Sequence, residues 1–322
     1  MGKTIFIHDL KLSKRKLNIF IESCIKLNSQ KYTNPFTLFV ISTFYSLKLI
    51  DKSIKKYLKP FNKKLIKPKH LYKTLKNPEN CDISSIYFFL MSCLILKKKI
   101  DNEKFFKLTL KFYNKKNGYF KNNSGEKCLK LTAMSLICLK IVEINFCSDC
   151  KVDNPFCNNF LKKIISIGFD KTKILINVNE KYNFDGGFSF EKGCESHLGY
   201  TYSALIIYKI LDINKDKFLD KESIVNHLKI LGRFKGRINK DNDSCYIYWG
   251  IACRKILDKV YNEKIFTYST VKGRDKKFLL KCYKNGGFSR DIWTNSDIIH
   301  TFYVIISDFV SRDIIDEIFL IK

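Results

Sequence analysis

Apolar residues recur every three or four positions along most of this chain, which is the pattern of helices that bury one face. The segments that show it most clearly are Arg15 to Lys26, Phe36 to Leu49, Ser85 to Leu96, Leu129 to Val142, Thr201 to Ile210 and Ser244 to Leu257. Strict alternation of apolar and polar residues, which indicates a half-buried strand, is scarce. The pattern therefore predicts an all-α fold.

Turns built from glycine and an aromatic residue separate these helices. Lys-Asn-Gly-Tyr-Phe ends at Phe120, Asp-Gly-Gly-Phe ends at Phe188, Asn-Gly-Gly-Phe ends at Phe288, and a degenerate copy contains Gly236. Gly187, Gly236 and Gly287 in three of these turns recur at intervals of about 50 residues, which is typical of repeated helical hairpins. The chain has 5 prolines and 14 glycines and no linker-like stretch. We therefore expect a single domain over residues 1–322.

Composition is consistent with a protein that folds around an apolar core in a reducing compartment. The chain has 322 residues, of which 45% are hydrophobic, so it needs no disulfide to fold. Its 12 cysteines are scattered, and Cys93, Cys138 and Cys253 fall on apolar faces. The N-terminal residues lack the apolar core of a signal peptide. The longest apolar run, Ile86 to Leu96, is far shorter than the roughly 20 residues of a membrane span. We expect a cytoplasmic protein without an integral membrane segment.

The strongly positive net charge of the chain can be interpreted in two ways. A formal net charge of +28 would suit a partner rich in phosphate, such as a nucleic acid. The lysines, however, are spread over the whole chain among many isoleucines, asparagines and phenylalanines, as expected for solvated helix faces in a protein with a biased composition. We therefore expect no nucleic-acid partner.

A cysteine-rich insertion lengthens one of the repeats. Between Gly118 and Gly187 the chain contains Cys147, Cys150 and Cys157, and the first two form a Cys-x-x-Cys pair that is able to bind zinc. A fourth ligand is missing nearby. We interpret the insertion as a surface loop.

A better candidate metal site combines two distant segments. Asp243 and Cys245 are two positions apart, so both reach one ion only if they lie at the start of a helix, because in mid-helix they would point to different sides. His300 opens a predicted helix one repeat further on. Each feature alone is weak evidence, since a lone histidine on an apolar face is more often part of the core.

Together these segments resemble the beta subunits of the protein prenyltransferases. The family pattern Arg-x-x-Lys-x-x-Asp-x-Cys-Tyr-x-x-Trp occurs intact, as Arg237, Lys240, Asp243, Cys245, Tyr246 and Trp249. Two further family motifs follow the same order, Glu195 to Tyr202 and Gly286 to Phe288 before His300. The resemblance covers about residues 11–309. It implies an α/α barrel (toroid) of repeated helical hairpins, with the active site in its central funnel and an obligate helical alpha subunit alongside.

The resemblance also implies a site and its cofactor. Asp243, Cys245 and His300 would hold one Zn²⁺ and leave a position open for the substrate thiol, whose pKa the metal lowers. The diphosphate of an isoprenoid would be bound by His197, Arg237, Lys240, Tyr246 and Arg290. Tyr200 and Trp249 match aromatic residues that line the lipid tunnel.

Three details of the resemblance favour the type I geranylgeranyltransferases over the farnesyltransferases. Arg290 replaces an aspartate that binds Mg²⁺ in farnesyl enzymes, so we expect no Mg²⁺ requirement. Thr37 matches a small residue that leaves room for a fourth isoprene unit, where farnesyl enzymes place tryptophan. Ile299 replaces a farnesyl-type tyrosine, whereas Tyr200 is more farnesyl-like. The expected activity is transfer from geranylgeranyl diphosphate to the cysteine of C-terminal CaaX proteins such as small GTPases.

Two alternative functions stay open beside that interpretation: a farnesyltransferase beta subunit, and a non-catalytic helical-barrel binding protein.

Departures from the family pattern also leave open how a peptide carboxylate is held. Asp82, Ser124 and Cys128 stand where the family has histidine, glutamate and arginine. Lys127 and Lys130 are candidates to replace the lost cation.

Overall fold

A computed structural model describes residues 4–7, 10–27, 35–51, 82–149, 169–212, 219–266 and 273–313. All six helical segments predicted from the hydrophobic pattern are helices in this structure. Only short strand pairs accompany the helices in the described ranges. The predicted all-α class is confirmed.

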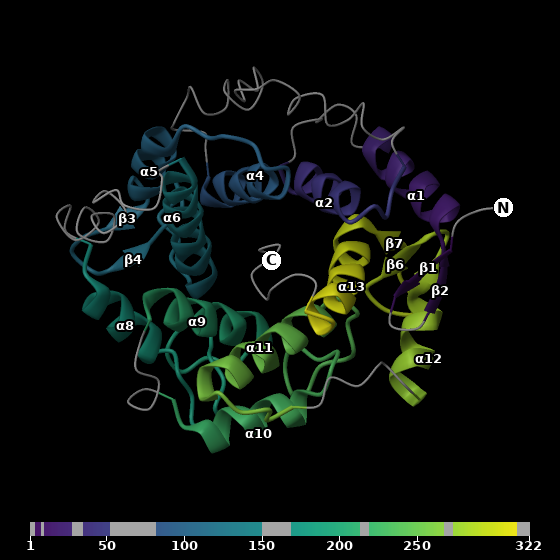
Figure 1. The fold of residues 1–322 in the computed structure, drawn as a ribbon. Helices are drawn as coiled ribbons and strands as arrows, with labels where there is room; N and C mark the ends of the chain where they lie inside the picture. The colour runs from purple at the N-terminus through teal and green to yellow at the C-terminus, as the bar shows by residue number, and fades with distance from the viewer. Residues whose placement is uncertain are drawn as a thin grey trace.

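Six of the helices form an inner ring (Figure 1). They are α2 (Pro35–Ser46), α4 (Ile83–Ile95), α6 (Leu129–Asp149), α9 (Leu198–Leu211), α11 (Tyr246–Tyr261) and α13 (Ile298–Ser311). Each inner helix contacts the next one, and α13 contacts α2. The ring is therefore closed, which is the toroid expected from the repeats.

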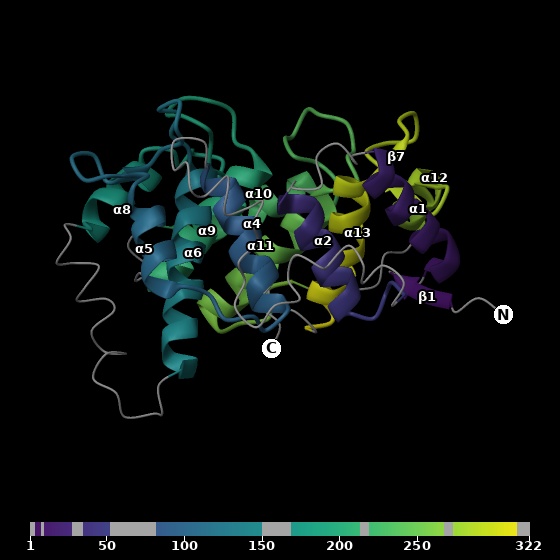
Figure 2. The same ribbon diagram turned by 90° about the horizontal axis from the view of Figure 1, so that it is seen from above.

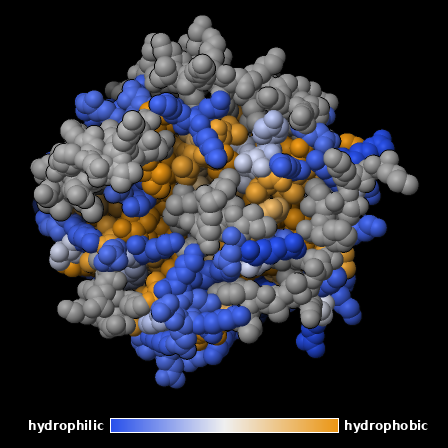
Figure 3. Space-filling view, viewed as in Figure 1, coloured by the Kyte–Doolittle hydropathy of each residue, from blue (hydrophilic) through white to orange (hydrophobic). Residues whose placement is uncertain are grey.

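The other helices lie outside this ring (Figure 1). They are α1 (Lys14–Leu27), α5 (Asn102–Leu110), α8 (Lys171–Asn179), α10 (Lys221–Leu231) and α12 (Gly273–Cys282). The sequence dictates the two layers, because the outer helices carry a polar face and the inner ones are apolar on most sides. In α4, for example, nine residues of thirteen are buried. Figure 3 shows apolar residues around the middle of the ring.

Short antiparallel strand pairs form the turns. The pairs are β1 (Thr4–Ile7) with β2 (Leu10–Ser13), β3 (Tyr113–Asn114) with β4 (Tyr119–Phe120), and β5 (Tyr283–Lys284) with β6 (Gly287–Ser289), which also pairs with β7 (Ser296–Asp297). In the last sheet Tyr283 lies opposite Phe288, and Phe288 lies opposite Asp297. This sheet delivers the chain to the start of α13.

Two of the repeats predicted from glycine spacing contain equivalent hydrogen bonds. The Phe188 N–H donates to Thr201 Oγ1 over 3.0 Å, and the Phe288 N–H donates to Thr301 Oγ1 over 2.7 Å. Each threonine lies in the first turn of an inner helix, thirteen residues after its phenylalanine. The same contact therefore fixes where α9 and α13 begin relative to the turn before them.

A glycine turn also closes the ring. Gly286 has φ +92°, and a Cβ there would lie 2.3 Å from the Lys16 carbonyl oxygen in the first turn of α1. Gly186 has φ +84° and packs in the same way on the Ser223 carbonyl in α10. Only glycine allows both this backbone conformation and this approach. The last repeat thereby docks on the first outer helix.

The turns that precede the inner helices gather at one end of the toroid (Figure 2). Because these turns come directly before α9, α11 and α13, the first residues of those helices share that end. The side chains predicted to carry chemistry lie in these same segments. The fold therefore brings together positions that are far apart in the sequence.

Cys93, Cys138 and Cys253 are buried, as predicted. Cys147 lies near the end of α6, and Cys150 and Cys157 lie outside the described residues, so the interpretation of that insertion stays a prediction. None of the described helices is both long enough and apolar enough to cross a membrane.

Candidate active site

Hydrogen bonds tie the loop before α11 to the loop before α13. The Asp243 N–H donates to the Phe234 carbonyl over 2.8 Å. The Ser244 N–H donates to the Arg290 carbonyl over 2.8 Å, and Ser244 Oγ donates to the Ser289 carbonyl over 2.7 Å. Ser244 is fully buried between the two loops. Its two bonds place Asp243 and Cys245 next to the beginning of α13.

Three possible metal ligands meet at this junction. One ligand atom from each of Asp243, Cys245 and His300 lies within 4.8 Å of the others. His300 Nε2 and Asp243 Oδ1 are 3.4 Å apart. Two N/O ligands of one tetrahedral zinc ion lie roughly 3.4 Å apart, so this pair already has the required spacing. As the sequence required, Cys245 directly precedes α11 and His300 is the third residue of α13.

The electrostatics of the group favour a bound cation. Burial and the neighbouring Asp243 carboxylate raise the pKa of the Cys245 thiol well above its usual value. Burial would also raise the pKa of Asp243, but hydrogen bonds with His300 and Cys245 outweigh it and keep that carboxyl ionised. A buried carboxylate beside a thiol that ionises only with a positive charge nearby is a donor set that fits zinc.

Asp297 fixes the orientation of His300. Its Oδ2 lies 2.5 Å from His300 Nδ1, and its Oδ1 accepts the N–H groups of Ile299 over 2.8 Å and of His300 over 3.0 Å. One carboxylate thus caps α13 and binds the imidazole, which leaves Nε2 facing Asp243. No role for Asp297 was predicted from the sequence. The signal was present, because a carboxylate three residues before a histidine at a helix start reaches its ring.

We expect Asp297→Asn to weaken zinc binding about 10- to 100-fold, because asparagine still caps the helix but no longer supplies a carboxylate to Nδ1. A competition titration with a chromophoric chelator measures the change. The metal-free variant should unfold at a somewhat lower temperature than the wild type at neutral pH, because the Asp297 carboxylate no longer stabilises charged His300. An unchanged zinc affinity would show that Asp297 only caps the helix.

Zinc affinity should also depend steeply on pH. Burial lowers the pKa of His300, but hydrogen bonds to Asp243 and Asp297 outweigh it and raise that pKa to about 9. Zinc binding at neutral pH must therefore displace one proton from His300 and one from the Cys245 thiol. We expect the logarithm of the association constant to rise by about two per pH unit between pH 6 and 8.

The stability of the metal-free protein should instead fall as the pH rises. A raised histidine pKa stabilises the folded state fully below the unfolded value of 6.5, and this contribution is lost as the pH rises through about 9. Thermal unfolding of the metal-free protein from pH 6 to 9 tests the sign of this stability change.

For the zinc-affinity prediction, an association constant that stayed the same over that pH range would contradict proton displacement from the site.

Beside the metal group lies a pair of hydrogen-bonded side chains. The Tyr246 hydroxyl is 2.9 Å from His197 Nε2, and His197 Nδ1 accepts the Gly199 N–H over 3.0 Å. Nε2 therefore carries the proton of the neutral ring. Burial and the charge of Arg237 lower the pKa of His197. A Cβ on Gly236 would lie 2.2 Å from the Tyr246 ring, so this close approach requires glycine.

Three cationic side chains surround this pair to different degrees. Arg237 pairs with Glu195 over 3.3 Å, and Arg290 Nε lies 3.5 Å from Asp243 Oδ2 with its side chain 63% exposed. The charges of Arg237 and Arg290 both act on Tyr246. Lys240 is exposed, and its ammonium group makes no ion pair with the described residues. The structure thus gathers His197, Arg237, Tyr246 and Arg290, and leaves Lys240 at the rim.

The predicted lipid-pocket residues fall into two groups. Trp249 is half-buried and lies 5.2 Å from the Tyr246 ring and 5.0 Å from Tyr303, a residue that the sequence analysis missed. Tyr200 lies 5.4 Å from His197.

The other two predicted pocket residues, Thr37 and Ile299, lie at the starts of α2 and α13. Thr37 is half-buried on α2 beside Phe36, whose ring is 6.5 Å from that of Tyr303. Ile299 is 48% exposed at the start of α13. Ring contacts therefore run from Tyr246 through Trp249 and Tyr303 to Phe36 on α2, and we call this row of rings the aromatic surface.

The fold and the site together define an α/α toroid with a three-ligand group at one end. The family model for the prenyltransferase alpha-alpha toroid domain matches residues 9–310. The chain belongs to this family, and the resemblance found in the sequence is confirmed.

Curated relatives include several kinds of prenyltransferase beta subunit. The Arabidopsis thaliana geranylgeranyl transferase type-1 subunit beta is 29% identical over 152 residues, which are 42% of this chain and 38% of that protein. The Saccharomyces cerevisiae type-2 subunit beta is 31% identical over 38% of each chain. The Arabidopsis thaliana protein farnesyltransferase subunit beta is 35% identical over 24% of this chain and 17% of that protein. The matched part thus spans well under half of each relative.

A solved structure extends the likeness over nearly the whole chain. It is titled Candida albicans protein geranylgeranyltransferase-I complexed with GGPP, and one of its chains matches with a TM-score of 0.64. The match covers 96% of this chain and 95% of that one at 18% identity. At this identity the match shows the shared fold.

Proposed function

We propose that this chain is the catalytic beta subunit of a zinc-dependent type I protein geranylgeranyltransferase. It transfers the lipid of geranylgeranyl diphosphate to the cysteine thiol of C-terminal CaaX proteins, such as small GTPases, in a cytoplasmic heterodimer with an alpha subunit. The observation that carries the proposal is the convergence of Asp243, Cys245 and His300 directly beside the His197–Tyr246 pair. A thiol-binding metal and an anion-binding cluster are thereby adjacent.

In this proposal different residues bind the two substrates, the acceptor thiol and the lipid diphosphate. Asp243, Cys245 and His300 would hold the metal, and the contact between Asp297 and His300 Nδ1 would leave Nε2 available to bind it. When bound, zinc supplies a positive charge that keeps the acceptor thiol ionised at neutral pH. The acceptor sulfur bonds to C1 of the lipid while the C1–O bond breaks, and the diphosphate leaves with the electron pair.

The leaving diphosphate needs positive charge and hydrogen-bond donors. The Tyr246 hydroxyl and the guanidinium groups of Arg237 and Arg290 can supply both, since both guanidinium charges act on Tyr246. Lys240 can join them because it is exposed and its side chain is long. The fixed charge of Arg290 takes the place that Mg²⁺ would otherwise fill, so the reaction should proceed without added magnesium.

The lipid would lie along the aromatic surface from Trp249 and Tyr200 toward α2. Flat rings provide apolar contact for an isoprenoid and stabilise partial positive charge near C1. Thr37 is a small side chain on α2, so it leaves space for a fourth isoprene unit. In this proposal Ile299, which is 48% exposed at the start of α13, contacts the acceptor peptide.

We expect Thr37→Trp to shift lipid preference toward farnesyl diphosphate, because an indole would occupy the space of the last isoprene unit. The ratio of kcat/KM for the C20 over the C15 lipid should fall at least about tenfold. Thr37→Val, which keeps the side-chain volume, is the matched control. If the ratio falls equally in both variants, side-chain size at this position does not set lipid length.

The test of the proposed function is a transfer assay with the chain co-expressed with a candidate alpha subunit. Labelled geranylgeranyl and farnesyl diphosphates are each offered with a peptide ending in Cys-Val-Leu-Leu, with zinc present and magnesium withheld. Geranylgeranyl transfer supports the proposal. Farnesyl preference would favour the alternative subtype, and zinc binding without transfer of either lipid would favour a non-catalytic binding protein.

A further inference from the structure

The segment that leads into α9, residues 194–197, carries two side chains of the cluster proposed to bind the diphosphate. The Glu195 carboxylate pairs with Arg237 over 3.3 Å, and His197 Nε2 lies 2.9 Å from the Tyr246 hydroxyl. The geometry of the cluster therefore depends on what holds this segment in position.

The equivalent segment before α13 is held by a strand pair that this segment lacks. Ser296 and Asp297 form β7, which pairs with β6. Residues 195–197 lie in no strand, although the His197 N–H donates to the Phe188 carbonyl over 2.9 Å. Before α9, hydrogen bonds of side chains take the place of that strand pair.

One carboxylate, that of Asp185, joins the segment to the glycine turn and to the outer helix α10. Asp185 Oδ1 accepts the Ser196 hydroxyl over 2.7 Å and the Gly187 N–H over 3.0 Å. Asp185 Oδ2 lies 3.3 Å from Nδ1 of His227 in α10. The Ser196 oxygen also accepts a hydrogen bond from Asn183 Nδ2 over 2.8 Å, so the serine is fixed from both sides.

The bond between Asp185 and Ser196 lies in a closely packed part of the molecule. Ser196 is 4% exposed and His227 is 1% exposed. A Cβ on Gly187 would lie 2.6 Å from both the His227 ring and the Ser196 Cβ, so the turn, the segment and α10 meet there. Burial lowers the pKa of His227, and the Asp185 carboxylate opposes this only in part. The imidazole therefore packs behind Asp185 as an uncharged group at neutral pH.

We propose that Asp185 is a positioning residue of the diphosphate site. It fixes Ser196, and through the backbone it fixes the neighbouring Glu195 and His197. Without this bond the segment shifts, so that the contacts of Glu195 with Arg237 and of His197 with Tyr246 no longer hold their donors together for one anion. The identity of that anion rests on the proposed function.

Binding of inorganic pyrophosphate tests the proposal without requiring turnover. Isothermal titration calorimetry measures it on the full chain, co-purified with an alpha subunit and loaded with zinc. We expect Asp185→Ala to weaken pyrophosphate binding about tenfold, because the donors lose their common position. Loss of a negative charge alone would have the opposite sign, since it makes the site more attractive to an anion.

Asp185→Asn is the conservative variant, because its amide oxygen still accepts the Ser196 hydroxyl and the Gly187 N–H. It should bind pyrophosphate within about twofold of the wild type. Asp170→Ala is the matched control, since it removes a carboxylate that caps the outer helix α8 by accepting the Lys173 N–H over 3.2 Å. It should preserve the affinity for pyrophosphate.

The proposal is wrong if Asp185→Ala binds pyrophosphate as tightly as the wild type, or if Asp185→Asn binds it as weakly as Asp185→Ala. Zinc affinity distinguishes a local shift from general loss of structure, because the metal ligands lie on the loops before α11 and α13. Asp185→Ala should leave zinc affinity unchanged. An equal loss of zinc and pyrophosphate binding would overturn a specific role of Asp185.

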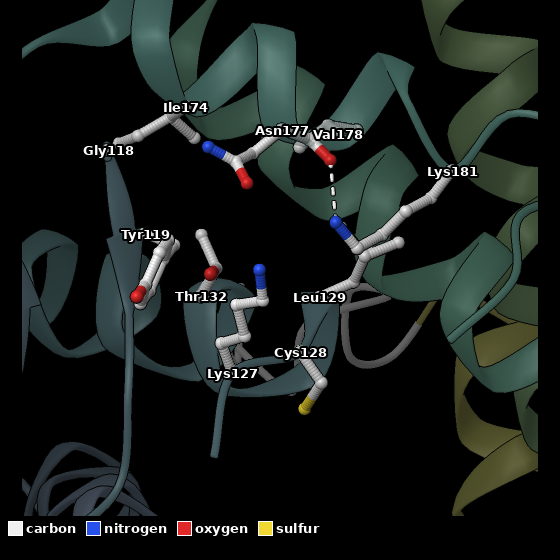
Figure 4. Close-up of a pocket in the computed structure, with 10 residues that line it drawn as sticks. All are labelled: Gly118, Tyr119, Lys127, Cys128, Leu129, Thr132, Ile174, Asn177, Val178 and Lys181. Atoms are coloured by element: carbon white, nitrogen blue, oxygen red, sulfur yellow. Dashed lines mark hydrogen bonds between the residues drawn. The ribbon is translucent and has the colours of Figure 1, made fainter. Parts of the chain in front are cut away.

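A second group of cations could also attract pyrophosphate. Lys127 and Lys181 point into a cleft between the start of α6 and α8 (Figure 4). Lys181 is 8% exposed, and its Nζ donates to the Asn177 carbonyl over 2.9 Å. Of the two lysines named from the sequence, Lys127 lines this cleft and Lys130 does not.

Lys181→Met separates the two positions and should leave pyrophosphate binding unchanged. If Lys181→Met removes the binding and Asp185→Ala does not, pyrophosphate occupies the cleft and the proposal is wrong. A wild-type protein that binds no pyrophosphate would contradict the diphosphate cluster and with it the proposed function. The expected effect of Asp185→Ala in a protein that transfers neither lipid would contradict the proposed function alone and leave the positioning role supported.

Discussion

We expect Cys245→Ala to abolish zinc binding and to lower geranylgeranyl transfer at least about a thousandfold, because the two remaining ligands would hold zinc poorly and the acceptor thiol would then stay protonated. Cys245 is 6% exposed and directly precedes α11, so its removal opens only a small space. The fold should survive. Metal content by mass spectrometry and the transfer assay measure the two effects on the same preparation.

Cys253→Ala is the matched control for this experiment. Cys253 is a fully buried thiol on the same helix and is not part of the metal group. Its replacement should cost some stability but should preserve zinc and transfer. A Cys245→Ala protein that retained stoichiometric zinc, or a Cys253→Ala protein that lost it, would contradict the assignment of the ligands.

Arg290→Asp should have the second-largest effect. Without magnesium we expect transfer to fall about 100- to 1000-fold, since the leaving diphosphate loses a fixed positive charge and meets a negative one. Millimolar Mg²⁺ should restore part of the rate, because the new carboxylate can share a magnesium ion with the diphosphate. Arg290 is suited to this test because its side chain is 63% exposed and its guanidinium lies beside Asp243.

The control for Arg290→Asp is Arg274→Asp, which makes the same change of charge on the exposed first turn of α12. It should alter neither the rate nor the magnesium dependence. Magnesium stimulation of the wild type, or an Arg290→Asp enzyme that is fully active without magnesium, would show that this arginine does not replace the metal.

Much of the fold followed from local patterns in the sequence. Helical spacing of apolar residues located α1 and five of the six inner helices, because burial on one face imposes a period of 3.6 residues whatever the partner is. The glycine turns were also legible, since a position such as Gly286 with φ +92° against the Lys16 carbonyl admits no other residue. The outer helices α5, α8, α10 and α12 were not predicted, and they are shorter and more polar.

The candidate site could be predicted only in part from the sequence. Asp243, Cys245 and His300 were named from residue types and from the resemblance, and the structure brings their ligand atoms within 4.8 Å. Asp297 was overlooked, although its spacing to His300 placed it one turn away. Lys181, which follows α8, could not have been found in this way, because its burial depends on the cleft that forms between α8 and the start of α6.

The sequence by itself determined the helical class, the repeat and the chemical types available at the site, because each of these depends on residues close together in the chain. The tertiary structure decided which of those residues meet. The buried hydroxyl of Ser244, bonded to the Ser289 carbonyl, sets Cys245 beside His300. Lys127 and Lys181, which are 54 residues apart, line one cleft between α8 and the start of α6. Such contacts join segments tens of residues apart, and only the closed ring fixes their distance.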